Sequence, residues 1–321
     1  MTRTLLAASV IATLAIVGCA GNDGTGTPSP APSTTTPDPT PSGDPNAPLD
    51  SSADPVPAGI PVLRAFDKAA GAEVAVDLSC AGKPLPVSRG PATDREFHLI
   101  NLGGQDIDRA GDAKVDIFLD NKFEMPADAT VQVKKTDDPT TSGVFTTKAQ
   151  PGWIAFRAVP SGTSAYLPII GLDLEVPDTG AVLPTLPTQE KVNMMSILIG
   201  GSDYEASKGS GRAVVRVVDC QGRPMVNTHV VLEIDGKVGK PAKTDGLRRS
   251  YFSDTEFPSM STTWTSRSGV VAFIEIPAGA KSIRAVARGI VDGQTKVIGL
   301  RPMPLVADGV TTAKLFPYAA Q

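Results

Sequence analysis

The sequence lacks an excess of positive charge and has few histidines. It contains 30 Lys and Arg residues against 34 Asp and Glu, which gives a formal net charge of −4. A nucleic-acid-binding domain normally carries a basic face, so this balance argues against a nucleic-acid partner. The two histidines, His98 and His229, stand far apart in the chain. They give no sequence signal of a histidine-based metal or catalytic centre.

The chain also lacks the short motifs of common catalytic sites. It has no His-Glu-x-x-His, no Gly-x-Ser-x-Gly and no glycine loop followed by Lys-Ser/Thr. The acidic stretch 106–117 has Asp at its first and third positions and Gly at its sixth, as calcium loops do. Its fifth position is Ala110 and its twelfth is Ile117, where such a loop needs Glu. We therefore expect a solvated turn there, and no metal, cofactor or catalytic residue.

One uncharged apolar run opens the chain and ends near a cysteine. Residues 4–17 follow Arg3 and are fewer than the ~20 that a membrane-spanning helix needs. No later apolar run is long enough to span a bilayer. The run leads into Gly18 and Cys19, which resembles the lipobox of bacterial lipoproteins. The resemblance implies cleavage before Cys19 and attachment of lipid, including palmitate, to this residue. The alternative is an ordinary signal peptide with a chance cysteine at the cut.

The resemblance also bears on location. The residue after Cys19 is Ala20 and not Asp, which in Gram-negative lipoproteins favours the outer membrane. Two or three acyl chains anchor a protein far better than one, because each buried CH₂ contributes about 0.8 kcal/mol. We expect a lipid-anchored protein of the cell envelope whose first partner is the membrane itself.

Residues 19–57 are rich in Pro, Thr, Ser and Gly and contain no aromatic residue. Such a segment cannot bury enough apolar surface to offset its ordering entropy, and its prolines favour extended conformations. It is expected to be a disordered tether between the lipid and the folded part. An O-glycosylated stalk has a similar composition and is the alternative.

The remaining residues contain one pattern twice. An apolar run leads into Cys-x-Gly-basic-Pro at 80–84 and again at 220–224. Gly152 and Gly269 each open a stretch with the pattern Gly-x-x-Ala-Phe-x-x-x-Pro-x-Gly. The two cysteines stand 140 residues apart and the two glycines 117, so the first copy carries about 23 extra residues, placed at 88–114. Landmarks that recur in a fixed order indicate an internal repeat.

The local pattern of both copies is that of β-strands. Short β-branched runs such as 212–218, 230–234 and 270–276 are separated by Gly-containing turns, which is typical of a sandwich. In the run 229–234, alternation places Val230 on the core face. His229 falls on the other face and is expected to point into solvent.

The second copy resembles the carboxypeptidase-regulatory-like modules of the transthyretin-like, or prealbumin-like, group. The residues that carry the resemblance are Asp219, Gly222, Pro224, Thr228, Val230, Thr265, Gly269, Val271, Phe273, Ile276, Pro277 and Gly279. The match covers about 211–290 well and is weaker in the first copy. It implies a Greek-key β-sandwich whose core includes Val271, Phe273 and Ile276 and, in the first copy, Ile154, Phe156 and Val159. It implies little about activity, because such modules serve many surface proteins.

These observations predict a mainly β protein with two tandem Greek-key, prealbumin-like β-sandwich domains. The expected segments are a signal peptide at 1–18, the tether at 19–57, a first domain at 58–176 with its insertion at 88–114, a linker at 177–210 and a second domain at 211–321. The linker should contain a short helix that begins after Thr188, ends at Gly200 or Gly201, and places Val192, Met195 and Ile199 on one face. This helix is expected to pack across a sandwich edge; a partner-binding helix is the alternative.

Two sets of side chains are candidates for special roles. Cys80 and Cys220 form a disulfide between the copies or remain two buried thiols, and their strand parities do not decide between these options. Tyr251, Phe252 and Phe257, together with Trp264, could form an exposed face for a glycan or peptide. The alternative is that these rings pack locally against a strand.

The expected function is a non-catalytic binding or scaffolding role in the envelope, with an envelope protein or glycan as partner. The first alternative is a carbohydrate- or peptide-binding accessory protein that works with a partner enzyme. The second is a hydrolase with an unfamiliar site, which would need ionisable groups clustered in a pocket.

Overall fold

A computed structural model describes residues 54–86, 90–101, 109–138, 140–162, 165–202, 204–241, 246–259 and 261–319. Cys19, the signal peptide, most of the tether and residues 106–108 of the acidic stretch lie outside the described residues. The mainly β class predicted from the sequence is confirmed, since strands in several sheets account for the described elements apart from one helix. We call 54–86 the N-terminal segment, 90–186 the first half and 211–319 the second half.

The strands fall into these three parts in sequence order. The N-terminal segment contains β1 (Arg64–Asp67) and β2 (Ala72–Val74). The first half contains β3 (Thr93–His98), β4 (Ile100–Asn101), β5 (Ala113–Phe118), β6 (Ala129–Val133), β7 (Val144–Ala149), β8 (Gly152–Pro160), β9 (Ile169–Val176) and β10 (Thr185–Leu186). The second half contains β11 (Gly211–Val217), β12 (Met225–Val226), β13 (His229–Ile234), β14 (Lys237–Val238), β15 (Arg248–Phe252), β16 (Pro258–Ser259), β17 (Val270–Ile276), β18 (Ile283–Val291), β19 (Gln294–Met303) and β20 (Val310–Leu315).

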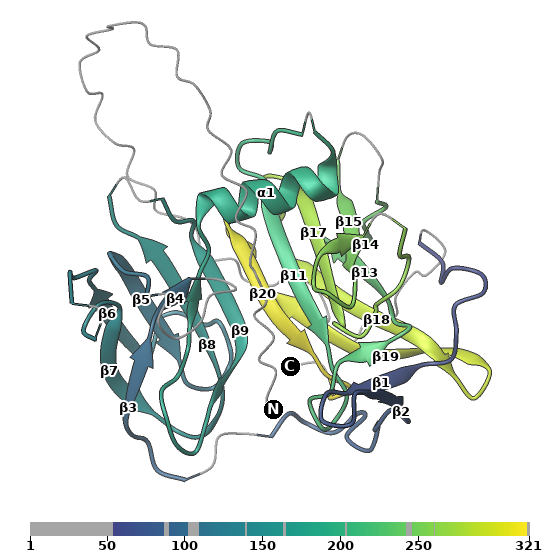
Figure 1. Cartoon of the computed structure of the whole chain (residues 1–321), viewed down its shortest axis with the longest axis horizontal. Coiled ribbons are helices and arrows are strands. Elements are labelled where there is room, and N and C mark those ends of the chain that lie inside the picture. The colour runs from purple at the N-terminus through teal and green to yellow at the C-terminus, as the bar shows by residue number, and fades with distance from the viewer. Residues whose placement is uncertain are drawn as a thin grey trace, which may run out of the picture. The chain divides into compact units, whose positions relative to one another are not determined.

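A nine-stranded sheet runs through both halves (Figure 1). Its order is β16-β15-β17-β11-β20-β9-β8-β5-β6, and the halves meet where β20 and β9 pair in parallel, with Val310 opposite Ile169. A four-stranded sheet, β14-β13-β18-β19, belongs to the second half, and the pair β3-β7 belongs to the first. All described residues belong to one compact unit. The predicted division into two domains stays a prediction.

Two main apolar cores underlie the fold. In the larger one, side chains such as Val215, Phe273 and Leu232 of the second half pack together. This core also takes in Phe118 and Ile170 of the first half. The second core lies mainly in the first half and includes Phe97 and Val115. Fully burying one such side chain is worth about 1.5–3 kcal/mol. Hydrophobic burial therefore joins the two halves, as the shared sheet does.

The N-terminal segment packs on the second half, although the sequence boundaries assign it to the first. Its strand β1 pairs with β12 through Ala65 and Met225. Leu63 lies in the second-half core, and its N–H donates to the carbonyl of Ile290. The apolar run before Cys80 thus contacts the second copy, a placement that depends on contacts distant in the sequence.

The predicted helix is present as α1 (Gln189–Gly200). The Thr188 hydroxyl accepts a hydrogen bond from the N–H of Lys191, and the helix ends at Gly201, whose φ is 99°. Val192 and Ile199 are buried as expected. The helix contacts β15 and β16 at the upper side of Figure 1, and its Ile199 packs in a cluster with Phe252 of β15 and Ile274 of β17.

One predicted core position is wrong. Val159 is 39% exposed, whereas the equivalent Ile276 of the second copy is fully buried. Glu275 has a left-handed backbone (φ 59°), which interrupts strand alternation so that Phe273 and Ile276 both point inward. The first copy has no such residue beside Val159, and strict alternation from Phe156 turns Val159 outward.

A buried ion pair on β5 gives the first half a dependence on pH. The Asp116 carboxylate accepts hydrogen bonds from the Thr130 hydroxyl (2.6 Å) and from Nε of Arg157 (2.9 Å), with Lys114 nearby. Burial raises the pKa of Asp116, but these hydrogen bonds and charges outweigh it and hold the pKa below 3.8. Because the folded-state pKa is lowered, this stabilisation is present above the ordinary aspartate range and disappears as the pH falls through the folded value.

We expect Asp116→Asn to unfold at lower denaturant concentration than the wild type at neutral pH. The difference should shrink as the pH falls below the ordinary aspartate range, because wild-type Asp116 then becomes protonated as well. Urea midpoints measured over this range test the prediction. Asp94→Asn is the control, since Asp94 forms an exposed pair with Lys148 and should change little. A pH-independent difference for Asp116→Asn would contradict the assignment.

Candidate functional site

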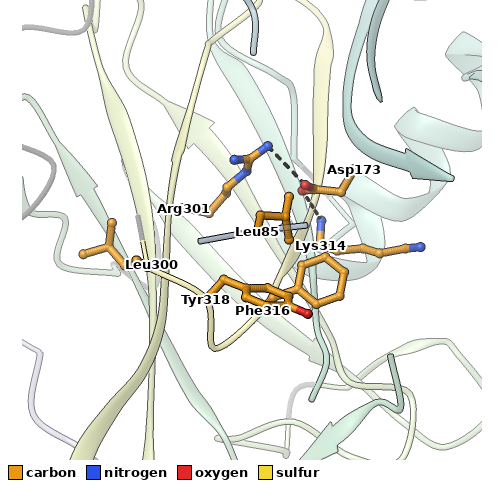
Figure 2. Close-up of a pocket in the computed structure, with 8 residues that line it drawn as sticks. Leu85, Asp173, Leu300, Arg301, Lys314, Phe316 and Tyr318 are labelled. Carbon is orange, nitrogen blue, oxygen red and sulfur yellow. Dashed lines mark hydrogen bonds and ion pairs between the residues drawn. The ribbon is translucent and has the colours of Figure 1, made fainter. Parts of the chain in front are cut away.

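The junction between the halves contains a small pocket (Figure 2). Its wall comes from Leu85 of the N-terminal segment and from Phe316 and Tyr318 after β20, and its polar side from Asp173, Arg301 and Lys314. The cavity measures ≈ 20 Å³. A single water needs about 10–15 Å³, so the enclosed space is close to that of one water molecule.

Asp173 forms the centre of the polar side. Its Oδ1 lies 3.1 Å from Nη2 of Arg301 on β19 and accepts a hydrogen bond from Nδ2 of Asn121 (2.7 Å). Its Oδ2 accepts the backbone N–H of Lys314 on β20 (3.2 Å). Figure 2 shows the carboxylate between Arg301 and Lys314. Since Asp173 belongs to β9 and two of these partners to the second half, this network fastens the halves together.

The rings beside the pocket form a cluster that the sequence analysis missed. Trp153 and Phe316 lie with ring centroids 5.3 Å apart, and Phe316 and Tyr318 lie 5.7 Å apart. Nζ of Lys314 stands 4.1 Å from the Trp153 centroid, which is a cation–π geometry. Burial lowers the pKa of Lys314 despite the nearby Glu175 and Asp173 carboxylates. No local motif marks this cluster, because Trp153 on β8 stands far in the sequence from Lys314, Phe316 and Tyr318 at the end of the chain.

Cys80 and Cys220 form a disulfide with an S–S distance of 2.03 Å and a Cα–Cα distance of 5.6 Å. The two cysteine turns also exchange hydrogen bonds: the N–H of Cys220 donates to the carbonyl of Asp77, and the N–H of Asp77 donates to Oδ2 of Asp219. Of the two options that the sequence left open, the structure therefore has the bridge. It ties the N-terminal segment to the second half.

His229 is 1% exposed, so the expectation that it points into solvent is wrong. One face of β13 packs into the second-half core, and on the other face His229 contacts Asp54 of the N-terminal segment. Nε2 of His229 lies 3.4 Å from Oδ1 of Asp54, and its Nδ1 lies 3.2 Å from the hydroxyl of Tyr251. Arg249 also pairs with Asp54. Burial raises the pKa of Asp54, but the bonds and charges of His229 and Arg249 hold it below its ordinary value.

The prediction of an exposed ligand face is wrong for two of its four residues. Tyr251 and Phe252 are 2% and 7% exposed, because β15 lies between two apolar layers. Tyr251 points into the second-half core, and its burial raises its pKa to about 12. Phe252 packs in a cluster with Ile199 of α1. Phe257 is 58% exposed and Trp264 is half-buried, so the four rings do not form one exposed surface.

The two histidines lie in different halves and in different surroundings. His98, on β3, is buried and its Nε2 lies 2.5 Å from a carboxylate oxygen of Glu96. Within the described ranges, no group of three or more His, Cys, Asp or Glu side chains could hold a metal ion. No helix in the described part of the chain combines the length and apolar character needed to cross a bilayer.

Comparison with known proteins assigns no family. No protein-family profile matches the chain, and no curated protein matches it. Among solved structures, it is similar to the Bacillus anthracis TIE protein, with 8% identity and a TM-score of 0.21. The match covers 72% of this chain and 34% of that protein, so the chain spans about a third of its length. A likeness this weak carries no conclusion about fold or function.

Proposed function

We propose that this protein is a lipid-anchored envelope protein whose folded part binds or organises a partner without catalysis. The observation that carries the location is the Cys80–Cys220 disulfide. Structural disulfides persist in oxidising compartments and are rare in the cytosol. The lipobox-like sequence at Cys19 and the Pro/Thr/Ser/Gly tether support the same location. In this proposal the lipid anchor holds the protein at a membrane. The residue after the anchor, Ala20, favours the outer membrane.

The folded part is proposed to be two tandem prealbumin-like Greek-key modules that have merged their sheets. The equivalent strands β8 and β17 support this proposal. Strand β8 begins at Gly152, whose φ is 140°, and β17 follows Gly269, whose φ is 67°. Each also buries its phenylalanine, Phe156 and Phe273. A scaffolding or binding role suits such modules, whose pockets need not enclose a substrate.

A peptide-binding accessory role is the second candidate. Three side chains on the outer side of α1, Met194, Ile197 and Leu198, are 49%, 43% and 44% exposed. Exposed apolar side chains that stand together on a helix favour contact with a protein partner. Pull-down from the native envelope with wild type and with Ile197→Ser tests this role, and equal partner recovery by both would count against it.

The anchor is tested at Cys19. Cells that express the wild type and are fed labelled palmitate should yield a labelled protein in the membrane fraction. Cys19→Ala should lose the label and leave the membrane fraction, because the thiol that accepts the lipid is gone. Cys80→Ala, made in parallel, should keep the label and so controls for general loss of cysteine. A wild-type protein that stays unlabelled and in the cytosol would refute the proposal.

A further inference from the structure

Three basic or titratable side chains converge on one aspartate at an edge of the second half. His229 begins β13, and Arg288 stands opposite it on β18. Arg249 reaches the same place from β15, in the other sheet. The carboxylate is that of Asp54, which belongs to the N-terminal segment and has a side chain only 12% exposed. We call His229, Arg249 and Arg288 the basic cluster.

The contacts of Asp54 are those of a bound carboxylate. Oδ2 pairs with Nη1 of Arg249, and Oδ1 lies 3.5 Å from its Nη2, so the guanidinium engages both oxygens. Nε2 of His229 lies 3.4 Å from Oδ1. Arg249 is fixed in turn by the carbonyl of Val230, which accepts a hydrogen bond from Nη1 (2.9 Å), and by the ring of Tyr251. Bidentate arginine contacts of this kind are typical of carboxylate recognition.

The basic cluster contains more positive charge than Asp54 neutralises. Arg288 is 3% exposed and donates to the backbone carbonyl of Asp54, not to its carboxylate. Among the described residues no carboxylate lies within ion-pair distance of Arg288, and its buried Nε has no hydrogen-bond partner. Arg288 and Arg249 thus share the single negative charge of Asp54. A buried guanidinium whose charge is only partly compensated is costly, which favours an additional or replacement anion at this position.

Asp54 can leave without unfolding the sheet. In the described backbone, residues 55–61 make no hydrogen bond to either half; the N–H of Ile60 donates to Pro57 within the segment itself. Firm attachment resumes at Val62 and Leu63, through Asn227 and Ile290. Release of Asp54 therefore breaks its own contacts and leaves β1 paired.

We propose that His229, Arg249 and Arg288 form a carboxylate-binding site, which Asp54 occupies in the resting chain and which admits the carboxylate of a ligand when Asp54 leaves. Because Asp54 is attached to the site, its effective concentration exceeds that of a free acid, and the wild type binds free carboxylates only weakly. The sequence boundaries assign residues 54–57 to the disordered tether, whereas in the structure Asp54 is packed against the second half. All members of the site therefore lie in the folded part, and the site is independent of the proposed lipid at Cys19.

Removal of the Asp54 carboxylate tests the site by chemical rescue. Asp54→Ala leaves a space that acetate fits, so we expect acetate to raise the melting temperature of this variant by several degrees above that in chloride at equal ionic strength. The wild type should show no acetate-specific rise. Acetamide, which has the same shape without the charge, should not rescue. If acetate and chloride give the same melting temperature for Asp54→Ala, the proposal is wrong.

Two further variants test whether the acetate effect depends on the basic cluster. Adding Arg249→Met to Asp54→Ala should abolish the rescue, whereas Glu73→Ala, which removes a more exposed carboxylate paired with Arg267, should show no acetate-specific shift. Should Asp54→Ala not fold, Asp54→Ser leaves a smaller space with a hydroxyl and is titrated with acetate in its place.

A dipeptide with a free carboxyl end, compared with its amide, distinguishes a peptide ligand from a small organic acid. Rescue by the free dipeptide assigns a peptide C-terminus, and rescue by acetate alone assigns a small organic acid.

Discussion

Asp173→Ala is expected to lower the free energy of unfolding by about 3–5 kcal/mol, the usual cost of removing one partner of a buried ion pair. Asp173 is 2% exposed, and its loss leaves the buried Arg301 without its counter-charge. The left-handed backbone at Asp173 (φ 59°) adds to the loss, because alanine tolerates it less well than aspartate or asparagine does. Urea unfolding of the purified variant measures the change.

Two variants on the same strand separate the causes. Asp173→Asn keeps the backbone preference and part of the hydrogen bonding to Asn121, so we expect a smaller loss than with alanine. Glu175→Ala removes an exposed carboxylate that lies 4.0 Å from Lys314, and should change stability by less than about 1 kcal/mol. If Asp173→Ala were no more destabilising than Glu175→Ala, the network at the junction would not hold the halves together.

Loss of the Cys80–Cys220 bridge is expected to have an effect of similar size. Replacing both cysteines by serine should cost about 4–5 kcal/mol in the chain-entropy description, because the bridge closes a loop across a sequence separation of 140 residues. Denaturant unfolding of the double variant and of the oxidised wild type measures this difference. The intact mass of native protein after alkylation, with and without prior reduction, establishes that the bridge was present at the start.

The wild type treated with reductant should match the double variant in stability. This comparison controls for any effect of the two serine hydroxyls that replace the sulfur atoms in the double variant. Free alkylation of both thiols in the native, unreduced protein would contradict the bridge.

The sequence predicted the parts of the fold that local patterns determine. Thr188 and Gly201 bound the helix because capping needs only nearby atoms, and alternation placed Val230 on the core face. The family resemblance, which assigned Val159 to the core as the equivalent of Ile276, failed where one residue changes the pattern. The left-handed Glu275 turns Ile276 inward, and nothing near Val159 does the same.

Site residues were harder to predict, because their burial depends on contacts with residues that are distant in the sequence. Alternation predicted an exposed His229, and loop composition predicted an exposed Tyr251, yet both are buried. His229 is covered by Asp54 of the N-terminal segment. Tyr251 is buried because β15 lies between two apolar layers. The network around Asp173 joins residues 121, 173 and 301, which share no motif. The parallel pairing of β9 with β20, which joins strands far apart in the sequence, contributes to bringing them together.

The cysteine bridge also determines how the chain behaves once a protease has cut it. The strands β3 to β10 and the helix α1 all lie between Cys80 and Cys220. A single cleavage anywhere in that stretch therefore yields two fragments that remain covalently joined. On electrophoresis without reductant the two fragments should migrate as one species, and only added thiol should separate them.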